Sequence, residues 1–245
     1  MSKIRVSAVS YTNTKPFVYG LEHSGILKEI ELSLDNPSDC ARKLIDNEVD
    51  IGLVPVAALI DIPDYTIISD FCIGADGAVN SVFIFSKKPI LKVKTLRLDK
   101  QSRTSNALAK ILLKNYWHLD IEFVSGDANA DAYVEIGDRT FGKKVNVPFV
   151  YDLAEEWKSF TGLPFAFAVW ASNKTIDPVF LKEFNQALEY GLQHRSEVIK
   201  EIPRREDIDL EDYLLHKIDY IFSDQKKEAL SLFLSYLRSM EFSNI

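Results

Sequence analysis

Segments with the apolar pattern of strands alternate with segments of helical spacing through the first two thirds of this chain. Such alternation predicts an α/β architecture in which helices separate the strands of largely parallel sheets. The strands are expected at residues 3–9, 30–34, 50–54, 65–69, 79–85, 95–98, 121–124, 132–136 and 165–171, and helices at residues 15–22, 38–47, 102–116 and 151–160.

The last third of the chain changes character, because its apolar residues recur at helical spacing over residues 178–201, 205–220 and 224–240. We expect a helical C-terminal cap. No long linker interrupts the sequence, so two lobes would be joined by short crossings near residues 86–90 and 165–171. The predicted division places residues 1–86 and 169–245, with both termini, in lobe I and residues 87–168 in an inserted lobe II, with a ligand cleft between them.

The chain has 245 residues, of which 47% are hydrophobic, and its formal net charge is −7. No stripe of Lys and Arg is visible, which disfavours a nucleic-acid partner. No apolar run is long enough to span a bilayer, so no membrane partner is expected. Residues 1–10 lack the apolar core of a signal peptide, and Cys40 and Cys72 have no metal-ligand spacing. Reduced, buried thiols and a cytoplasmic location are therefore expected.

A strand, a polar turn and a helix follow one another between residues 95 and 113. Ser102, Thr104 and Ser105 fall where the first N–H groups of that helix lack partners, and Arg103 lies among them. A helix start of this kind can bind a carboxylate or a phosphate. The simpler interpretation is that Ser102 or Thr104 only caps the helix, as Ser and Thr usually do.

Other polar residues stand at the expected ends of strands, where α/β sheets bind ligands. Tyr11 and Asn13 follow the first strand, and Pro55 ends the strand at residues 50–54. These residues could equally form ordinary turns before a helix.

Two further segments carry candidates. Asn80 and Ser81 interrupt an apolar strand, where an unpaired polar group would cost about 1–3 kcal/mol, so each needs a partner. Gly137 and Asp138 close the strand at residues 132–136, although Asp138 could also belong to a surface turn.

Several motifs are absent from the sequence. It contains neither a Gly-rich dinucleotide fingerprint, nor a phosphate loop, nor a His-Glu-x-x-His motif. The four histidines, at positions 23, 118, 194 and 216, accompany no other candidate motif. A metal site or a nucleophilic triad is therefore not predicted.

Taken together, the motifs resemble the chorismate dehydratase family of the futalosine route to menaquinone. The resemblance is strong over residues 3–172, and its most specific segments are Ser-Arg-Thr-Ser from residue 102 and Thr-Gly-Leu-Pro-Phe-Ala-Phe-Ala-Val-Trp from residue 161. The other matching segments are Ser-Tyr-Thr-Asn-Thr-Lys-Pro-Phe from residue 10, Asp-Ile-Gly-Leu-Val-Pro-Val from residue 50, Val-Asn-Ser-Val-Phe-Ile-Phe-Ser from residue 79 and Glu-Ile-Gly-Asp-Arg from residue 135. The family usually carries Leu-Asn where this chain has Thr12-Asn13, but the Asn is retained.

The resemblance implies the two-lobed fold of type II periplasmic binding proteins and the loss of water from chorismate to give 3-[(1-carboxyvinyl)oxy]benzoate. Aromatisation drives that reaction, so no cofactor is expected, and the partner is the small-molecule substrate. Asn13 and Ser81 would be catalytic, and the helix start would hold a carboxylate. The substrate-binding residues would be Tyr11, Pro55, Asn80, Ser102, Arg103, Thr104, Ser105, Gly137 and Asp138.

Three points stay open at this stage. The same cleft could serve a non-catalytic binding protein for small anions. It could also belong to the sister enzyme of the pathway, which forms a naphthoate and is expected to use a catalytic His. The oligomeric state is not determined, and a homodimer is possible.

Overall fold

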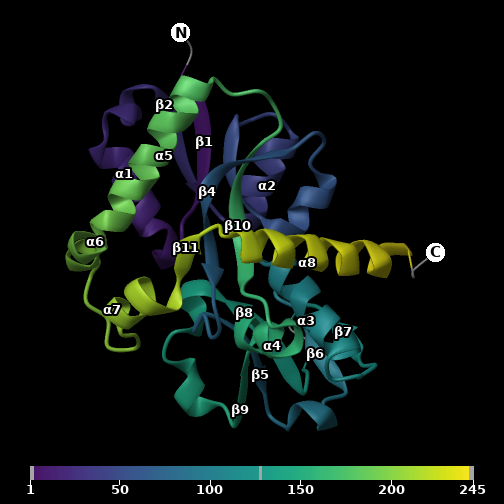
Figure 1. Ribbon diagram of the computed structural model, residues 1–245. Helices are drawn as coiled ribbons and strands as arrows, with labels where there is room; N and C mark the ends of the chain where they lie inside the picture. The colour runs from purple at the N-terminus through teal and green to yellow at the C-terminus, as the bar shows by residue number, and fades with distance from the viewer. Residues whose placement is uncertain (1–2, 127–128, 243–245) are drawn as a thin grey trace.

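The computed structural model describes residues 3–126 and 129–242, and its strands form two mixed sheets (Figure 1). The six-stranded sheet has the order β11-β4-β10-β3-β1-β2, and the five-stranded sheet has the order β7-β6-β8-β5-β9. The α/β prediction is confirmed. The first sheet is built from β1 (Ile4–Val9), β2 (Ile30–Asp35), β3 (Ile51–Pro55), β4 (Thr66–Ala75), β10 (Phe165–Ser172) and β11 (Asp219–Ile221). The second is built from β5 (Val82–Ser86), β6 (Thr95–Arg97), β7 (Glu122–Val124), β8 (Ala132–Ile136) and β9 (Phe149–Asp152).

The prediction of largely parallel sheets was wrong. β1 pairs in parallel with β2 and β3, but β10 pairs antiparallel with both β3 and β4. In the second sheet β6 is parallel to β7 and β8, whereas β5 is antiparallel to β8 and β9. The reason is topological: β4 leads out of the first sheet and β10 returns to it, so the two must run in opposite directions.

Helices cover the first sheet. α1 (Lys15–His23) packs against α5 (Pro178–Gln193), and α2 (Pro37–Ile45) packs against β3 and β1. The α1–α5 contact depends on two glycines, because a Cβ on Gly191 would lie 1.8 Å from the carbonyl oxygen of Pro16 and one on Gly20 would lie 2.0 Å from that of Ala187. Backbone therefore meets backbone at this crossing.

The second sheet carries α3 (Arg103–Asn115) and α4 (Leu153–Thr161). Part of the helix predicted at residues 151–160 is instead β9, which pairs with β5. Asp152 is the reason, because its carboxylate accepts hydrogen bonds from the N–H groups of Ala154 and Glu155 and so starts α4 only after residue 152.

Sheet membership bears on the predicted lobes. β5 belongs to the second sheet, so a division of the chain by sheets falls between β4 and β5 rather than at residue 86. The return crossing coincides with the predicted strand, observed as β10. The exact lobe boundaries stay a prediction.

The C-terminal third differs most from its prediction. The expected helix at residues 205–220 is replaced by α7 (Leu210–Asp212), a π-helical turn (Tyr213–Lys217) and β11. A break at His194 separates α5 from α6 (Arg195–Glu201). The final helix, α8 (Asp224–Phe242), lies across the junction of the two sheets and contacts β10 and α3 (Figure 1). Short 3-10 turns occupy Thr12–Thr14, Gly25–Lys28, Val56–Asp61, Ile90–Lys92, Gly137–Thr140 and Lys143–Asn146.

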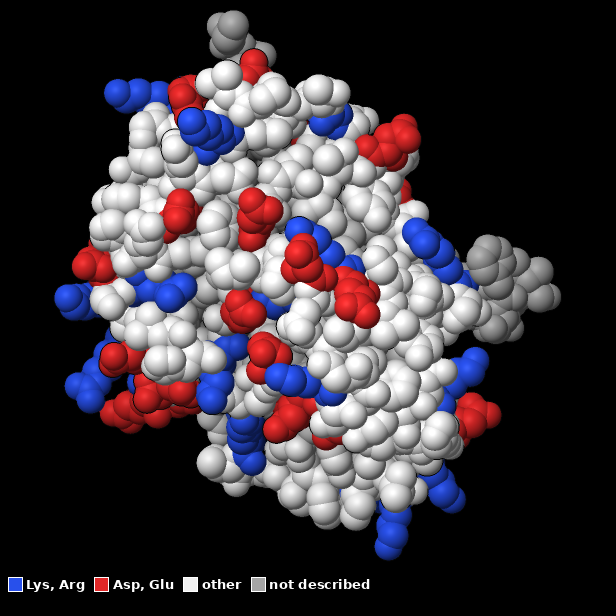
Figure 2. Space-filling model, viewed as in Figure 1, with Lys and Arg blue, Asp and Glu red and all other residues white. Residues whose placement is uncertain are grey.

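The surface charges and the two cysteines match what the sequence predicts, namely no basic stripe and buried, unpaired thiols. On the face shown in Figure 2, acidic and basic side chains are interspersed and form no continuous basic area. Cys40 and Cys72 are free and buried, and burial raises the pKa of each thiol to about 12. Over the described residues, the helices are all too short or too polar to cross a membrane.

Candidate active site

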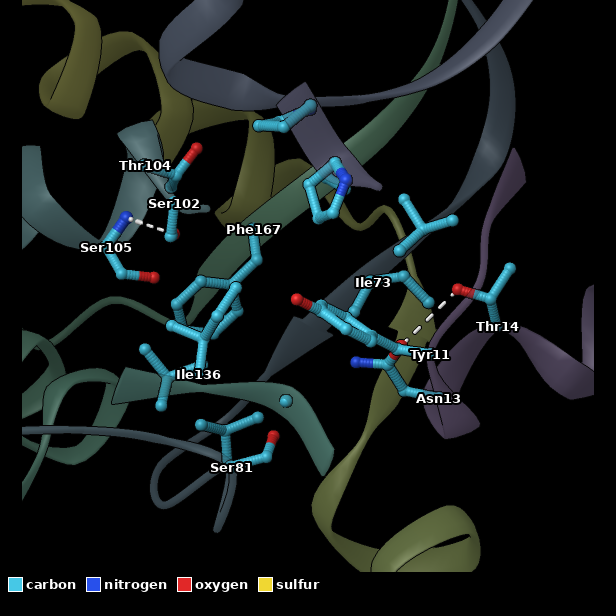
Figure 3. A pocket seen from close by; sticks show the side chains of 17 residues that line it. Tyr11, Asn13, Thr14, Ile73, Ser81, Ser102, Thr104, Ser105, Ile136 and Phe167 are labelled. Carbon is cyan, nitrogen blue, oxygen red and sulfur yellow. Dashed lines mark hydrogen bonds between the residues drawn. The ribbon is translucent and has the colours of Figure 1, made fainter. Parts of the chain in front are cut away.

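A pocket of about 560 Å³, counting its open mouth, lies where the two sheets meet, with walls from both (Figure 3). It brings together eight of the eleven residues predicted for the site, namely Tyr11, Asn13, Pro55, Ser81, Ser102, Thr104, Ser105 and Gly137. Asn13 and Ser105 therefore line one pocket rather than opposite outer faces. Apolar side chains complete the lining, among them Ile73, Ile136 and Phe167.

The first turn of α3 forms one wall, here called the α3 wall and made of Ser102, Thr104 and Ser105. Ser102 caps the helix, since its Oγ accepts a 3.1 Å hydrogen bond from the N–H of Ser105. Thr104 Oγ1 accepts a 3.1 Å hydrogen bond from the N–H of Ala57, which fixes the helix start against the 3-10 turn that follows β3. The capping interpretation thus holds for Ser102.

Ser105 differs from its two neighbours on this wall. It is buried, and within the described parts of the chain its hydroxyl has no hydrogen-bond partner. The same holds for the backbone N–H groups of Arg103 and Thr104. The helix start therefore presents unpaired donors, together with the positive end of the helix dipole, beside the pocket.

The opposite side, here called the Asn13–Ser81 wall, is supported by two buried tyrosines. The hydroxyl of Tyr213 donates a 2.8 Å hydrogen bond to Ser81 Oγ, and that of Tyr220 donates a 2.9 Å bond to the carbonyl of Asn13. Thr14 Oγ1 donates to Asn13 Oδ1 at 3.3 Å. With the oxygen thus engaged, the amide nitrogen of Asn13 points toward the middle of the pocket (Figure 3).

Tyr11 and Gly137 lie against each other at the pocket. Gly137 has a φ of +64°, and a Cβ there would lie 2.9 Å from Cε2 of the Tyr11 ring. Glycine is required for both reasons. The Tyr11 hydroxyl donates a 2.9 Å hydrogen bond to Gln101 Oε1, which links the loop after β1 to the loop before α3. Burial raises the pKa of Tyr11, and the nearby Arg139 opposes that shift.

Three predicted site residues do not line the pocket. Asp138 accepts hydrogen bonds from the N–H and the hydroxyl of Thr12, the latter at 2.8 Å. Asn80 accepts a hydrogen bond from Lys144, and Arg103 pairs with Asp61. Asp138 still helps to hold the pocket together, because its hydrogen bonds join the loop after β1 to the end of β8.

Sequence reasoning missed Tyr213 and Tyr220, which are the supports of the Asn13–Ser81 wall. Both belong to the segment predicted as a helix, where their apolar rings matched helical spacing. It also missed Phe167, although Phe167 lies in the Thr-Gly-Leu-Pro-Phe-Ala-Phe segment that had been singled out.

The chemistry available in the pocket is that of hydroxyls, an amide and backbone N–H groups. Among the described residues that line it, Tyr11 is the sole titratable side chain, and burial favours its neutral form. Within the same residues no three His, Cys, Asp or Glu side chains gather as a metal site would require. Such a pocket can bind an anion and donate hydrogen bonds, but it offers no strong protein base.

Comparisons with known proteins agree with the fold and with the resemblance. A chorismate dehydratase from Thermus thermophilus is 28% identical over 223 residues, which cover 80% of each chain. The crystal structure of protein AF1704 from Archaeoglobus fulgidus superposes with a TM-score of 0.74 at 17% identity, over 98% of both chains. The Candida albicans CA3427 gene product, described as having the generic periplasmic binding protein fold, gives a TM-score of 0.61 at 15% identity, over 98% of this chain and 95% of that one.

These structural matches establish the two-lobed periplasmic-binding-protein-like fold. The family model described as menaquinone biosynthesis matches residues 4–239. With nearly the whole chain covered, this protein belongs to the menaquinone biosynthesis family.

Proposed function

We propose that this protein is a chorismate dehydratase, which eliminates water from chorismate to give 3-[(1-carboxyvinyl)oxy]benzoate on the futalosine route to menaquinone. One observation carries the proposal: the pocket sets the unpaired donors of the α3 wall opposite the amide of Asn13 and the hydroxyl of Ser81, with no carboxylate or histidine among the described residues that line it. The similarity to a chorismate dehydratase supports the same reaction.

Chorismate carries two carboxylates, so its binding site must stabilise negative charge. The α3 wall suits a carboxylate, because the N–H groups of Arg103 and Thr104 and the hydroxyl of Ser105 are free to donate. When the ring loses its proton, negative charge delocalises onto the ring carboxylate. Donors already in place there stabilise that charge without reorganisation.

The elimination breaks one C–H bond and one C–O bond on adjacent ring carbons. The C–H electron pair becomes the new ring double bond, and the hydroxyl departs with its bonding pair. Asn13 and Ser81 would orient the ring and donate hydrogen bonds to the departing hydroxyl. The enolpyruvyl carboxylate of the substrate takes the ring proton, because no described residue that lines the pocket carries a carboxylate or an imidazole. The enolpyruvyl carboxyl group then gives this proton to the departing hydroxide, which leaves as water.

Hydrogen bonds between the loops of the first sheet and those of the second sheet favour a closed, dry site. Tyr11 donates to Gln101, Thr12 donates to Asp138, and the N–H of Ala57 donates to Thr104. Excluding water strengthens the electrostatic interactions inside and protects the charged intermediate from stray proton transfer. Closure of this kind also brings Asn13, which follows β1 of the first sheet, within reach of a ligand held beside Ser81 and Ser105.

A purely binding function is the main alternative, and the binding-protein-like fold of the structural neighbours favours it. The sister naphthoate-forming enzyme is disfavoured, because the lining of the pocket includes no His among the described residues.

The experiment that separates these functions is incubation of the purified protein with chorismate. We expect the diene absorbance to fall and a product lighter by one water to accumulate. Ser86→Ala is a matched control for Ser81→Ala, since Ser86 is a buried serine of β5 whose hydroxyl bonds the carbonyl of Lys88, at the far end of the strand from the pocket. Binding of chorismate without loss of the diene would leave the protein a binding protein and refute the proposal.

A further inference from the structure

Tyr213 stands behind the pocket rather than in it. It begins the π-helical turn that follows α7, far along the chain from Ser81, and its side chain is buried. Its ring meets Phe141 edge-on, with 5.3 Å between ring centroids and an interplanar angle of 77°. Its own N–H donates to the carbonyl of Asp209 at 3.0 Å, and its carbonyl accepts from the N–H of Ile218 at 3.1 Å. Packing and backbone bonds therefore hold the ring.

The contact between Tyr213 and Ser81 has a direction. A serine hydroxyl has one proton to donate and two lone pairs that accept. The tyrosine hydroxyl donates to Ser81 Oγ at 2.8 Å, so the serine proton must point elsewhere. Within the described residues no group accepts from Ser81 Oγ, and this oxygen lines the pocket (Figure 3). The serine proton is thus left for a ligand.

The tyrosine keeps its proton in this arrangement. Burial raises the pKa of Tyr213 well above its ordinary value, although hydrogen bonding with Ser81 and Asn13 opposes that shift. A neutral phenol donates and can accept at the same time. Tyr213 therefore remains able to donate to Ser81 Oγ.

We propose that Tyr213 is a positioning residue which, by donating to Ser81 Oγ, turns the serine proton into the pocket toward the leaving hydroxyl of the substrate. This inference rests on the proposed dehydration. As the C–O bond breaks, the departing oxygen gains negative charge and accepts from Ser81, whose own oxygen is polarised by the phenol behind it. Hydrogen bonds in such a chain strengthen one another. No proton leaves Tyr213, and the water formed takes its second proton from the substrate.

The test is a double-mutant cycle with Tyr213→Phe and Ser81→Ala, measured as chorismate turnover. Tyr213→Phe keeps the ring against Phe141 and removes only the hydroxyl. We expect kcat to fall about fivefold to tenfold, the range of one hydrogen bond, with KM changed less than about twofold. In the Ser81→Ala background the same change should cost less than about twofold, because its target is gone. Tyr151→Phe is the matched control, since it also loses one hydrogen bond, from the N–H of Ile90, and we expect wild-type turnover.

The outcomes separate the inference from the proposed function. A wild-type protein that does not dehydrate chorismate refutes the function and the inference with it. An active wild type in which the two losses multiply, or in which Tyr213→Phe changes only KM, refutes the inference alone.

Should Tyr213→Phe fail to fold, 3-fluorotyrosine at position 213 keeps the shape and strengthens the donor. We then expect kcat to rise about twofold, which corresponds to a few tenths of a hydrogen bond's contribution. A kcat equal to that of the wild type would contradict the inference.

Discussion

The two walls of the pocket are built in different ways. The α3 wall owes its donors to one local event, the start of a helix, and Ser102 caps that start with a hydroxyl three residues from its partner Ser105. The Asn13–Ser81 wall depends on Tyr213 and Tyr220, whose bonds span 132 and 207 residues of the chain. The donors of the first wall are therefore set by one local segment, whereas the second wall requires tertiary contacts between distant parts of the chain.

This difference predicts separable responses to mutation. A change on the α3 wall should leave the other wall in place, because among the described residues Ser105 makes no hydrogen bond to Asn13 or Ser81. A change at Tyr213 or Tyr220 should disturb only the Asn13–Ser81 wall.

The largest effect is expected for Asn13→Ala. Its amide is the donor that reaches into the pocket, and loss of a donor to developing charge typically costs about 10²–10³ in turnover. We expect turnover to fall by that amount while circular dichroism stays unchanged. Asn115→Ala is the control, because Asn115 bonds the carbonyl of Ile111 at the far end of α3. Near-normal turnover in a folded Asn13→Ala protein would mean that Asn13 only forms the turn after β1 and has no catalytic role.

A pH-dependent stability is expected from Asp152, which binds the backbone next to Ser81. Asp152 accepts the N–H of Asn80 at 2.7 Å, and burial raises the pKa of its carboxyl to about 6 from an ordinary 3.8. The folded protein therefore holds this proton more tightly than the unfolded chain. Stability from this group is greatest below about pH 4 and is lost as pH rises to about 6, by at most about 3 kcal/mol.

Asp152→Asn should remove that loss and still cap α4. We expect the free energy of unfolding of the variant, relative to wild type, to increase between pH 4 and pH 6 and to level off above. Chemical denaturation at several pH values measures it. A constant difference between the two proteins across this window would contradict the assignment.

Ser105 allows the α3 wall to be tested as a ligand site on its own. Ser105→Ala removes a hydroxyl that has no partner in the described protein, so stability should change little. Backbone donors remain, so we expect turnover to fall only about tenfold to a hundredfold. Ser105→Asp should be worse, because it places a like charge beside the carboxylate. Steady-state kinetics at one ionic strength tests this. A Ser105→Asp protein as active as wild type would mean that the carboxylate does not bind at the start of α3.

The smallest effect is expected for Ser102→Ala. This change should lower the stability of the fold more than it lowers turnover. Ser102 is the cap of α3, and loss of such a cap typically costs about 1 kcal/mol of stability. Thermal or denaturant unfolding should show that loss, with a smaller change in turnover than for Ser105→Ala. If Ser102→Ala and Ser105→Ala proved indistinguishable in both assays, the distinction between cap and ligand donor would fail.

The contrast between the walls also explains what could be read from the sequence. Helix starts, strand ends and Gly137 carry local signals, and eight of the eleven predicted residues do line the pocket. Strand direction carries no periodicity, so the antiparallel pairing of β10 was missed. Tyr213 was missed because its partner is 132 residues away and its segment has helical spacing without a long helix.

The central claim is that both walls act on one substrate, and a structure with bound 3-[(1-carboxyvinyl)oxy]benzoate tests it most directly. We expect one carboxylate within hydrogen-bond distance of Ser105 Oγ and the N–H of Thr104. The ring should lie against Phe167, and the carbon that lost the hydroxyl should face Ser81 and Asn13. A product bound outside this pocket, or held with both carboxylates away from the start of α3, would contradict the claim.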